Sequence, residues 1–149
     1  MDRRGISPVI ATVIIVAVTI AVSIAVAYWM GGLASFFTRF EKIEIGTAYA
    51  TGSESSGFEI ILTPIKNTGS ADASITDVYI NGKLLSTWSG ISVNVTLPAS
   101  VVAGGKINVM KISVPSSLSG TAPFTSGTTL SVTLHTASGK DYPVNVALP

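Results

Sequence analysis

One feature constrains this chain more than any other: residues 5–38 contain no Asp, Glu, Lys or Arg. About 20 apolar residues are enough to cross a bilayer as a helix, so this run is longer than a span requires. A helix over residues 6–40 would be about 50 Å long at 1.5 Å per residue. A cleaved secretory signal fits poorly, because its apolar region is only about 7–15 residues long. The sequence therefore predicts a membrane-spanning helix near the amino end.

The residues at the two ends of this run predict its orientation. Arg3 and Arg4 precede it, and basic residues beside a span stay on the cytoplasmic side. Tyr28 and Trp29 lie where an interfacial aromatic belt would fall on the opposite side. We expect the amino terminus inside and the carboxyl-terminal domain outside the cell.

Small residues recur every four positions within the run, with a neighbouring row of alanines. Small side chains let helix backbones approach closely, which is how apolar helices associate in membranes. Such residues are also common in any membrane helix, so the rows alone do not distinguish a packing surface from the ordinary composition of a membrane helix. Gly31 and Gly32 predict a bend, local melting or a flexible linker near the helix end. The predicted packing positions are Ala17, Thr19, Ala21, Ser23, Ala25, Ala27 and Gly31.

Composition excludes several functional classes. Charged residues make up 11% of the chain, roughly half the share usual in soluble domains, and the net charge is only +1. No basic stripe is present to bind nucleic acid. Cysteine is absent and His135 is the single histidine, with no acidic partner nearby in sequence. We therefore expect no enzyme activity, no cofactor and no metal, and His135 as a solvent-facing structural residue.

After Arg39 the apolar pattern changes from helical to alternating, which predicts strands. Asn81-Gly82 predicts a two-residue hairpin, and the slip between Val109 and Met110 predicts a bulge. Pro64 predicts an edge strand or a bulge. The positions expected to face inward are Ile91, Val93, Val95 and Leu97, then Leu130, Val132 and Leu134, then Val144, Val146 and Leu148. Seven or eight such strands predict an antiparallel, immunoglobulin-like β-sandwich, with a barrel as the alternative.

Two kinds of surface site are suggested by short motifs. Asn94 begins the sequon Asn-Val-Thr on an outward strand position and is a candidate N-glycosylation acceptor. The Ser- and Thr-rich residues 115–129 predict either an O-glycosylated segment or an ordinary exposed loop. Two pairs of acidic residues could hold a cation, although their spacing matches no calcium loop, and solvated turn charges are the simpler interpretation. These pairs are Glu54 with Glu59, and Asp72 with Asp77.

The opening "RRGISPVIATVIIVAV" resembles the class III signal peptide and amino-terminal helix of archaeal type IV pilins. The resemblance implies that a prepilin peptidase recognises Arg3, Arg4 and Gly5, cuts after Gly5 and leaves Ile6 as the mature amino terminus. Archaellins share the signal type but usually lack the Ser-Pro start. Bacterial type IV pilins carry glutamate at the fifth mature position, where this chain has Ile10. The later stretch "IKNTGSADASITDVYINGKLL" is similar to archaeal pilin heads and surface-adhesion modules.

The resemblance also implies a division of the chain and a function. Residues 1–5 would be the signal peptide, 6–40 the helix and 41–149 an extracellular head, giving an α+β chain. The partners would be further copies of this chain, the prepilin peptidase with the pilus assembly machinery, and the membrane in the precursor. The expected function is a structural subunit of an adhesive filament on the archaeal cell surface.

Removal of the arginines has a physical reason, because each charge in a dry helical core would cost several kcal/mol. The alternatives are an archaellin-like filament subunit and a membrane-anchored extracellular binding module that does not polymerise. Retained Arg3 and Arg4 would indicate the anchored module, whereas Ile6 at the amino terminus would indicate the pilin.

Overall fold

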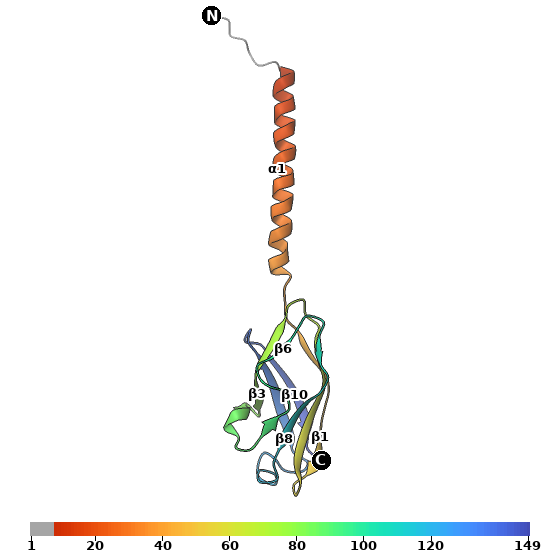
Figure 1. The fold of residues 1–149 in the computed structure, drawn as a ribbon, viewed down its shortest axis with the longest axis vertical. Coiled ribbons are helices and arrows are strands. Elements are labelled where there is room, and N and C mark those ends of the chain that lie inside the picture. Colours follow the sequence, from red (N-terminus) through yellow and green to blue (C-terminus); the bar gives the residue numbers. More distant parts are fainter. Residues whose placement is uncertain (1–7) are drawn as a thin grey trace, which may run out of the picture. The chain divides into compact units, whose positions relative to one another are not determined.

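A computed structural model describes residues 8–149, and the chain divides into two compact units at Arg39 and Phe40 (Figure 1). The first unit contains helix α1 (Pro8–Phe37). Pro8 occupies the first helical position, where its missing N–H costs no hydrogen bond. The helix continues through Gly31 and Gly32 without interruption, so the predicted melting or linker at that point is wrong.

The second unit consists of strands, which we call the head. Its elements are β1 (Ile43–Ser53), β2 (Gly57–Asn67), β3 (Ala73–Ile80), β4 (Lys83–Leu84), the 3-10 helix η1 (Leu85–Thr87), β5 (Ser92–Val93), β6 (Ala99–Val101), β7 (Lys106–Ile107), β8 (Met110–Val114), β9 (Thr129–Thr136) and β10 (Asp141–Ala147). One sheet has the order β1-β2-β8-β5, with β7 beside β2. The other has the order β10-β9-β3-β4, with β6 beside β3. Every pairing is antiparallel, so the α+β class is confirmed.

The two sheets share one hydrophobic core, to which β8 and β9 contribute alternate residues, whereas the alternation of β2 slips between Leu62 and Ile65. The three predicted inward residues of β9 are fully buried, as is Val146 of β10. The predicted hairpin at Asn81 and Gly82 is confirmed, because both residues have positive φ angles, of 50° and 75°, between paired strands. The largest fully buried side chains are Phe58, Phe124, Ile60, Leu62, Ile65, Ile75, Ile80, Met110, Ile112, Leu130, Leu134 and Val78.

The strand predicted over residues 91–98 is much shorter than expected. Its four apolar residues do pack against the core, but only Ser92–Val93 forms a strand. The cause lies at Asn94, whose side-chain Oδ1 accepts the N–H of Lys111 at 2.7 Å in place of a backbone carbonyl. The Asn94 N–H still donates to the Lys111 carbonyl at 3.1 Å, so the backbone pairing ends at this residue, beside the side-chain bond.

Pro64 does not mark an edge strand, because β2 is paired on both sides. The predicted irregularity is present: pairing of β2 with β8 ends at Leu62, and pairing with β7 begins at Ile65. The predicted slip at Val109 and Met110 coincides with the gap between β7 and β8. Pro64, which has no N–H to donate, occupies the matching gap in β2.

Candidate assembly surface

Helix α1 is apolar on every face, and none of its side chains is buried within the chain. Among the described residues it is the one helix that is long and apolar enough to span a membrane, judged by length and composition. A surface helix of a soluble domain normally has one apolar stripe and one polar face. This helix therefore needs an apolar environment around its whole circumference.

The polar atoms of the small-residue rows are satisfied within the helix itself. Thr19 Oγ1 donates to the Ile15 carbonyl at 2.7 Å, and Ser23 Oγ donates to the Thr19 carbonyl at 2.7 Å. Both hydroxyls are turned back onto their own backbone, so the rows present small surfaces to a neighbour. A side chain added at Gly31 would meet no atom within 4 Å, so nothing in the described chain requires a glycine there.

The two rows lie on opposite sides of α1. The prediction that they are neighbouring rows is therefore wrong. Successive residues turn by about 100° at 3.6 residues per turn, so residues two positions apart differ by about 200°. Thr19, Ser23 and Ala27 thus form one narrow face, and Ala17, Ala21 and Ala25 form another on the far side. Two opposite narrow faces allow one helix to contact two others at once. The remaining predicted sites at this end, Arg3, Arg4, Gly5 and Ile6, lie outside the described residues.

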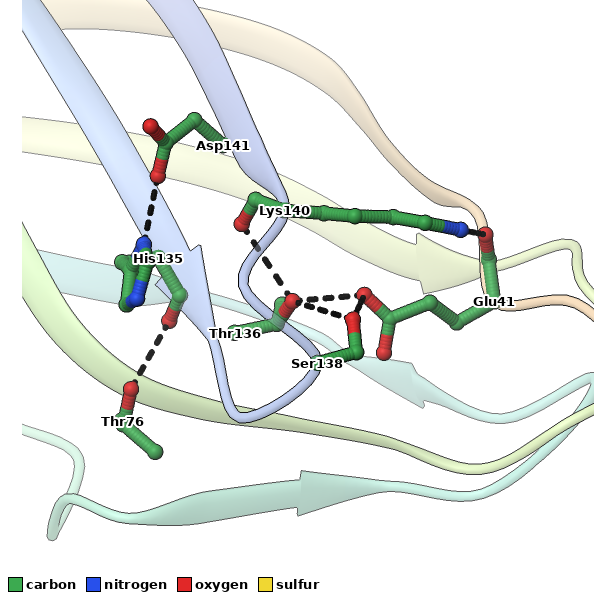
Figure 2. Close-up of polar contacts among 7 residues, drawn as sticks. All are labelled: Glu41, Thr76, His135, Thr136, Ser138, Lys140 and Asp141. Atoms are coloured by element: carbon green, nitrogen blue, oxygen red, sulfur yellow. Dashed lines mark hydrogen bonds and ion pairs between the residues drawn. The ribbon is translucent and has the colours of Figure 1, made fainter.

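The chain entering the head is fixed by a buried carboxylate, which the sequence analysis missed. Glu41 is only 8% exposed and is the one charged residue buried in the described part of the chain. Its Oε1 accepts hydrogen bonds from the Thr136 hydroxyl, at 2.5 Å, and from the Ser138 hydroxyl (Figure 2). Its backbone carbonyl accepts from Lys140 Nζ at 3.1 Å. The end of β9 and the turn that follows it therefore hold Glu41 in place, four positions after the end of α1.

This contact gives a stability prediction. Replacing Glu41 with alanine leaves the buried Thr136 hydroxyl without that acceptor, so we expect a loss of about 2 kcal/mol of unfolding free energy. Denaturant unfolding of the full chain in detergent micelles measures it. Glu44→Ala is the matched control, because Glu44 pairs with Lys42 at 2.7 Å on the exposed surface and should matter little. Equal effects of the two substitutions would contradict the role assigned to Glu41.

A second buried group, Asn67, ties the β2–β3 loop to the end of β6 at the same end of the head. Its Nδ2 donates to the carbonyls of Ala71, at 2.8 Å, and Val101, at 2.9 Å, and its Oδ1 accepts from the Gly69 N–H. The carbonyl of Phe40 in turn accepts the N–H of Ala71 at 2.9 Å. Asn67 thus stabilises the loops that hold the chain where it enters the head.

His135 has an acidic partner, contrary to the sequence-based expectation. The β9–β10 register places Asp141 opposite it, and Nδ1 lies 2.6 Å from the Asp141 Oδ1 (Figure 2). The pairing was missed because six residues separate the two in sequence. Tyr79 packs edge-on against the imidazole at 6.0 Å. Among the described residues no hydroxyl is hydrogen-bonded to the other ring nitrogen, so the pair lacks an aligned nucleophile.

Three of the four acidic residues considered as cation ligands have partners in the protein. Glu54 accepts the Ser126 N–H at 2.9 Å, Glu59 pairs with Lys111 at 3.3 Å, and Asp72 accepts the Ala103 N–H at 2.8 Å. Within residues 8–149 no group of three or more His, Asp or Glu side chains could hold a metal ion. These carboxylates have structural roles in the head.

The sequon residue Asn94 is exposed, as its position predicted, but its side chain is engaged. Besides accepting from Lys111, it donates through Nδ2 to the Val109 carbonyl at 3.4 Å. The segment considered for O-linked sugar is not simply an exposed loop, because Phe124 within it is buried and packs edge-on against Trp88 at 5.1 Å. One Phe within a Ser- and Thr-rich segment does not indicate from sequence alone that its side chain will be buried in the core.

No protein-family model matches this chain, and no curated protein matches it in sequence.

Proposed function

We propose that this chain is a structural subunit of an archaeal type IV pilus, which polymerises through α1 into an extracellular adhesive filament. One observation carries the proposal: a 30-residue helix is apolar on all sides and has no buried side chain. At 1.5 Å per residue it is about 45 Å long, against about 30 Å for the hydrocarbon core of a bilayer. Crossing the hydrocarbon core does not require that extra length, whereas packing against other copies uses all of it.

The two opposite small-residue faces support assembly into a filament. A contact between different faces of neighbouring copies is heterologous, and repetition of such a contact generates an open helical array. The predicted cleavage after Gly5 would remove Arg3 and Arg4, which orient the precursor with its amino terminus inside and would be costly in a dry core. The mature subunit would then lie in a filament on the cell surface.

The order of strands supports an immunoglobulin-like sandwich for the head. In that fold one sheet has the strand order A-B-E-D and the other contains C, F and G, with C′ added in the variable type. Strands β1-β2-β8-β5 and β10-β9-β3-β4 follow the orders A-B-E-D and G-F-C-C′. Such a head would form the outer wall of the filament and carry its adhesive surface.

The test is the amino terminus of the native protein. Mass spectrometry of surface filaments should find Ile6 as the first residue, while the membrane fraction should contain precursor that retains Arg3 and Arg4. Gly5→Val should block the cut, so that precursor accumulates in the membrane and filaments disappear. A native chain found only in the membrane, with its first five residues intact, would instead indicate the anchored binding module. A rotating, motor-driven filament would indicate the archaellin-like alternative.

A further inference from the structure

One end of the head combines exposed apolar side chains with lysines, and we call it the basal face. It consists of Phe40, Lys42, Lys66, Val102, Lys106 and Lys140. Phe40 is 53% exposed and Val102 is 57% exposed, more than any other large hydrophobic residue of the described head. Exposed apolar residues of this size usually mark an interaction site when they occur together.

Contacts within the head bring these residues to the same end. Asn67 binds the carbonyls of Val101 and Ala71, and Ala71 binds the carbonyl of Phe40. Val102 begins a tight turn closed by the bond from the Gly105 N–H to its carbonyl, at 2.8 Å. The two apolar side chains are therefore presented on backbone that is fixed by a shared buried residue.

The lysines break a local rule of sheet formation. Lys66 of β2 and Lys106 of β7 are directly opposite each other in the register, and like charges in that position are destabilising. Neither forms an ion pair among the described residues, nor does Lys140, whereas Lys42 is paired with Glu44. The bond to Glu44 raises the pKa of Lys42 and lowers the pKa of Glu44, so both stay charged at neutral pH. Lys66 also lies opposite Glu44 of β1 and contributes to the lowered pKa of that carboxyl, so one carboxylate faces both Lys42 and Lys66. The four lysines still outnumber the exposed carboxylates at this end, Glu44 and Asp72, which leaves the basal face positive and suited to an external anion.

We propose that the basal face binds an anionic lipid surface while the precursor waits in the membrane, with Phe40 and Val102 among the headgroups and Lys66 and Lys106 at the phosphates. The inference rests on α1 crossing the membrane before assembly. A helix of about 45 Å spans a bilayer together with its headgroup regions, which measure about 40–45 Å, or tilts to bury its apolar length. Only Thr38 and Arg39 separate this helix from Phe40, so a helix that spans in this way keeps Phe40 beside the bilayer. Apolar insertion combined with attraction of lysines to anionic lipids is a general mode of surface binding.

The absence of cysteine from the chain allows a direct test on the full precursor. An environment-sensitive fluorophore is attached to Ala103→Cys, beside Val102, or to Ser117→Cys near the opposite end of β2, about 30 Å away. Each labelled chain is reconstituted in vesicles of phosphatidylcholine alone or with added phosphatidylglycerol. We expect a blue shift for the Ala103 label only, larger in the anionic vesicles and reduced at about 1 M salt, where the Debye length falls to about 3 Å.

Two double variants identify the groups responsible. Lys66→Gln with Lys106→Gln should remove most of the response to anionic lipid. The change relieves a like-charge contact but also removes the attraction between Lys66 and Glu44, so thermal stability should change little. Lys83→Gln with Lys111→Gln makes the same charge change outside the basal face and should leave the response intact. An Ala103 label as exposed to water as the Ser117 label in both vesicles would overturn the proposal. A shift that disappears on dilution of protein in lipid would also overturn it, in favour of contact with a second copy. None of these readouts depends on filament formation, so the pilin proposal stands or fails separately.

Discussion

Filaments are expected to disappear when Ser23 and Ala27 are both replaced by leucine, while insertion of the precursor into the membrane is retained. Leucine is more apolar than either residue, so the helix should enter the bilayer at least as readily. Its bulk would hold neighbouring helices apart along the narrow face of α1. At about 1 kcal/mol or more for each disrupted contact, we expect filament yield to fall more than about tenfold. Electron microscopy of shed filaments and immunoblots of the membrane fraction measure the two quantities.

Two controls separate side-chain size from position. Ser23→Ala with Ala27→Gly keeps the face narrow and should retain filaments. Val18→Leu with Val22→Leu enlarges residues at the same spacing on the face between the two rows, and filaments should survive that change too. Normal filaments from the Ser23 and Ala27 leucine variant would show that this face is not an assembly surface.

The features that could be predicted from the sequence are those with a local cause. The charge-free run specifies α1, and alternation specifies which residues of β9 and β10 are buried, because each depends on one segment alone. The Asn81-Gly82 hairpin is likewise encoded in two adjacent residues. The shortened strand at Ser92–Val93 was not foreseeable, since it depends on where the Asn94 side chain meets another strand.

The contacts of the polar groups at the base of the head could not be predicted, because the neighbours of each group depend on strand register. Glu41 looks like one more charge in a polar segment, and only the fold brings it to Thr136, 95 positions later. The opposition of Lys66 and Lys106 likewise follows from the pairing of β2 with β7. Residues that are ordinary in sequence thus become a buried contact and a charged face only through long-range pairing.

Asn67→Ala should be the most destabilising single polar substitution in the head, costing about 3 kcal/mol or more of unfolding free energy. Asn67 is fully buried, and its side chain makes three hydrogen bonds of 2.8–3.0 Å to backbone groups. Alanine would leave the buried Val101 carbonyl, and the half-buried Ala71 carbonyl and Gly69 N–H, without these partners. A buried group left unpaired typically costs about 1–3 kcal/mol. Asn67→Asp should be at least as harmful, because a carboxylate would face the carbonyls of Ala71 and Val101.

Urea unfolding in detergent micelles, followed by the fluorescence of Trp88 in a Trp29→Phe background, measures this loss within the head. Asn145→Ala is the matched control, because Asn145 is exposed on β10 and its removal should change the midpoint little. Since Asn67 also fixes the loops that present Phe40 and Val102, the Ala103 label should lose its lipid response in Asn67→Ala even at temperatures where the sheets persist. If Asn67→Ala unfolds at the urea concentration of the unsubstituted chain, these three bonds do not stabilise the base of the head.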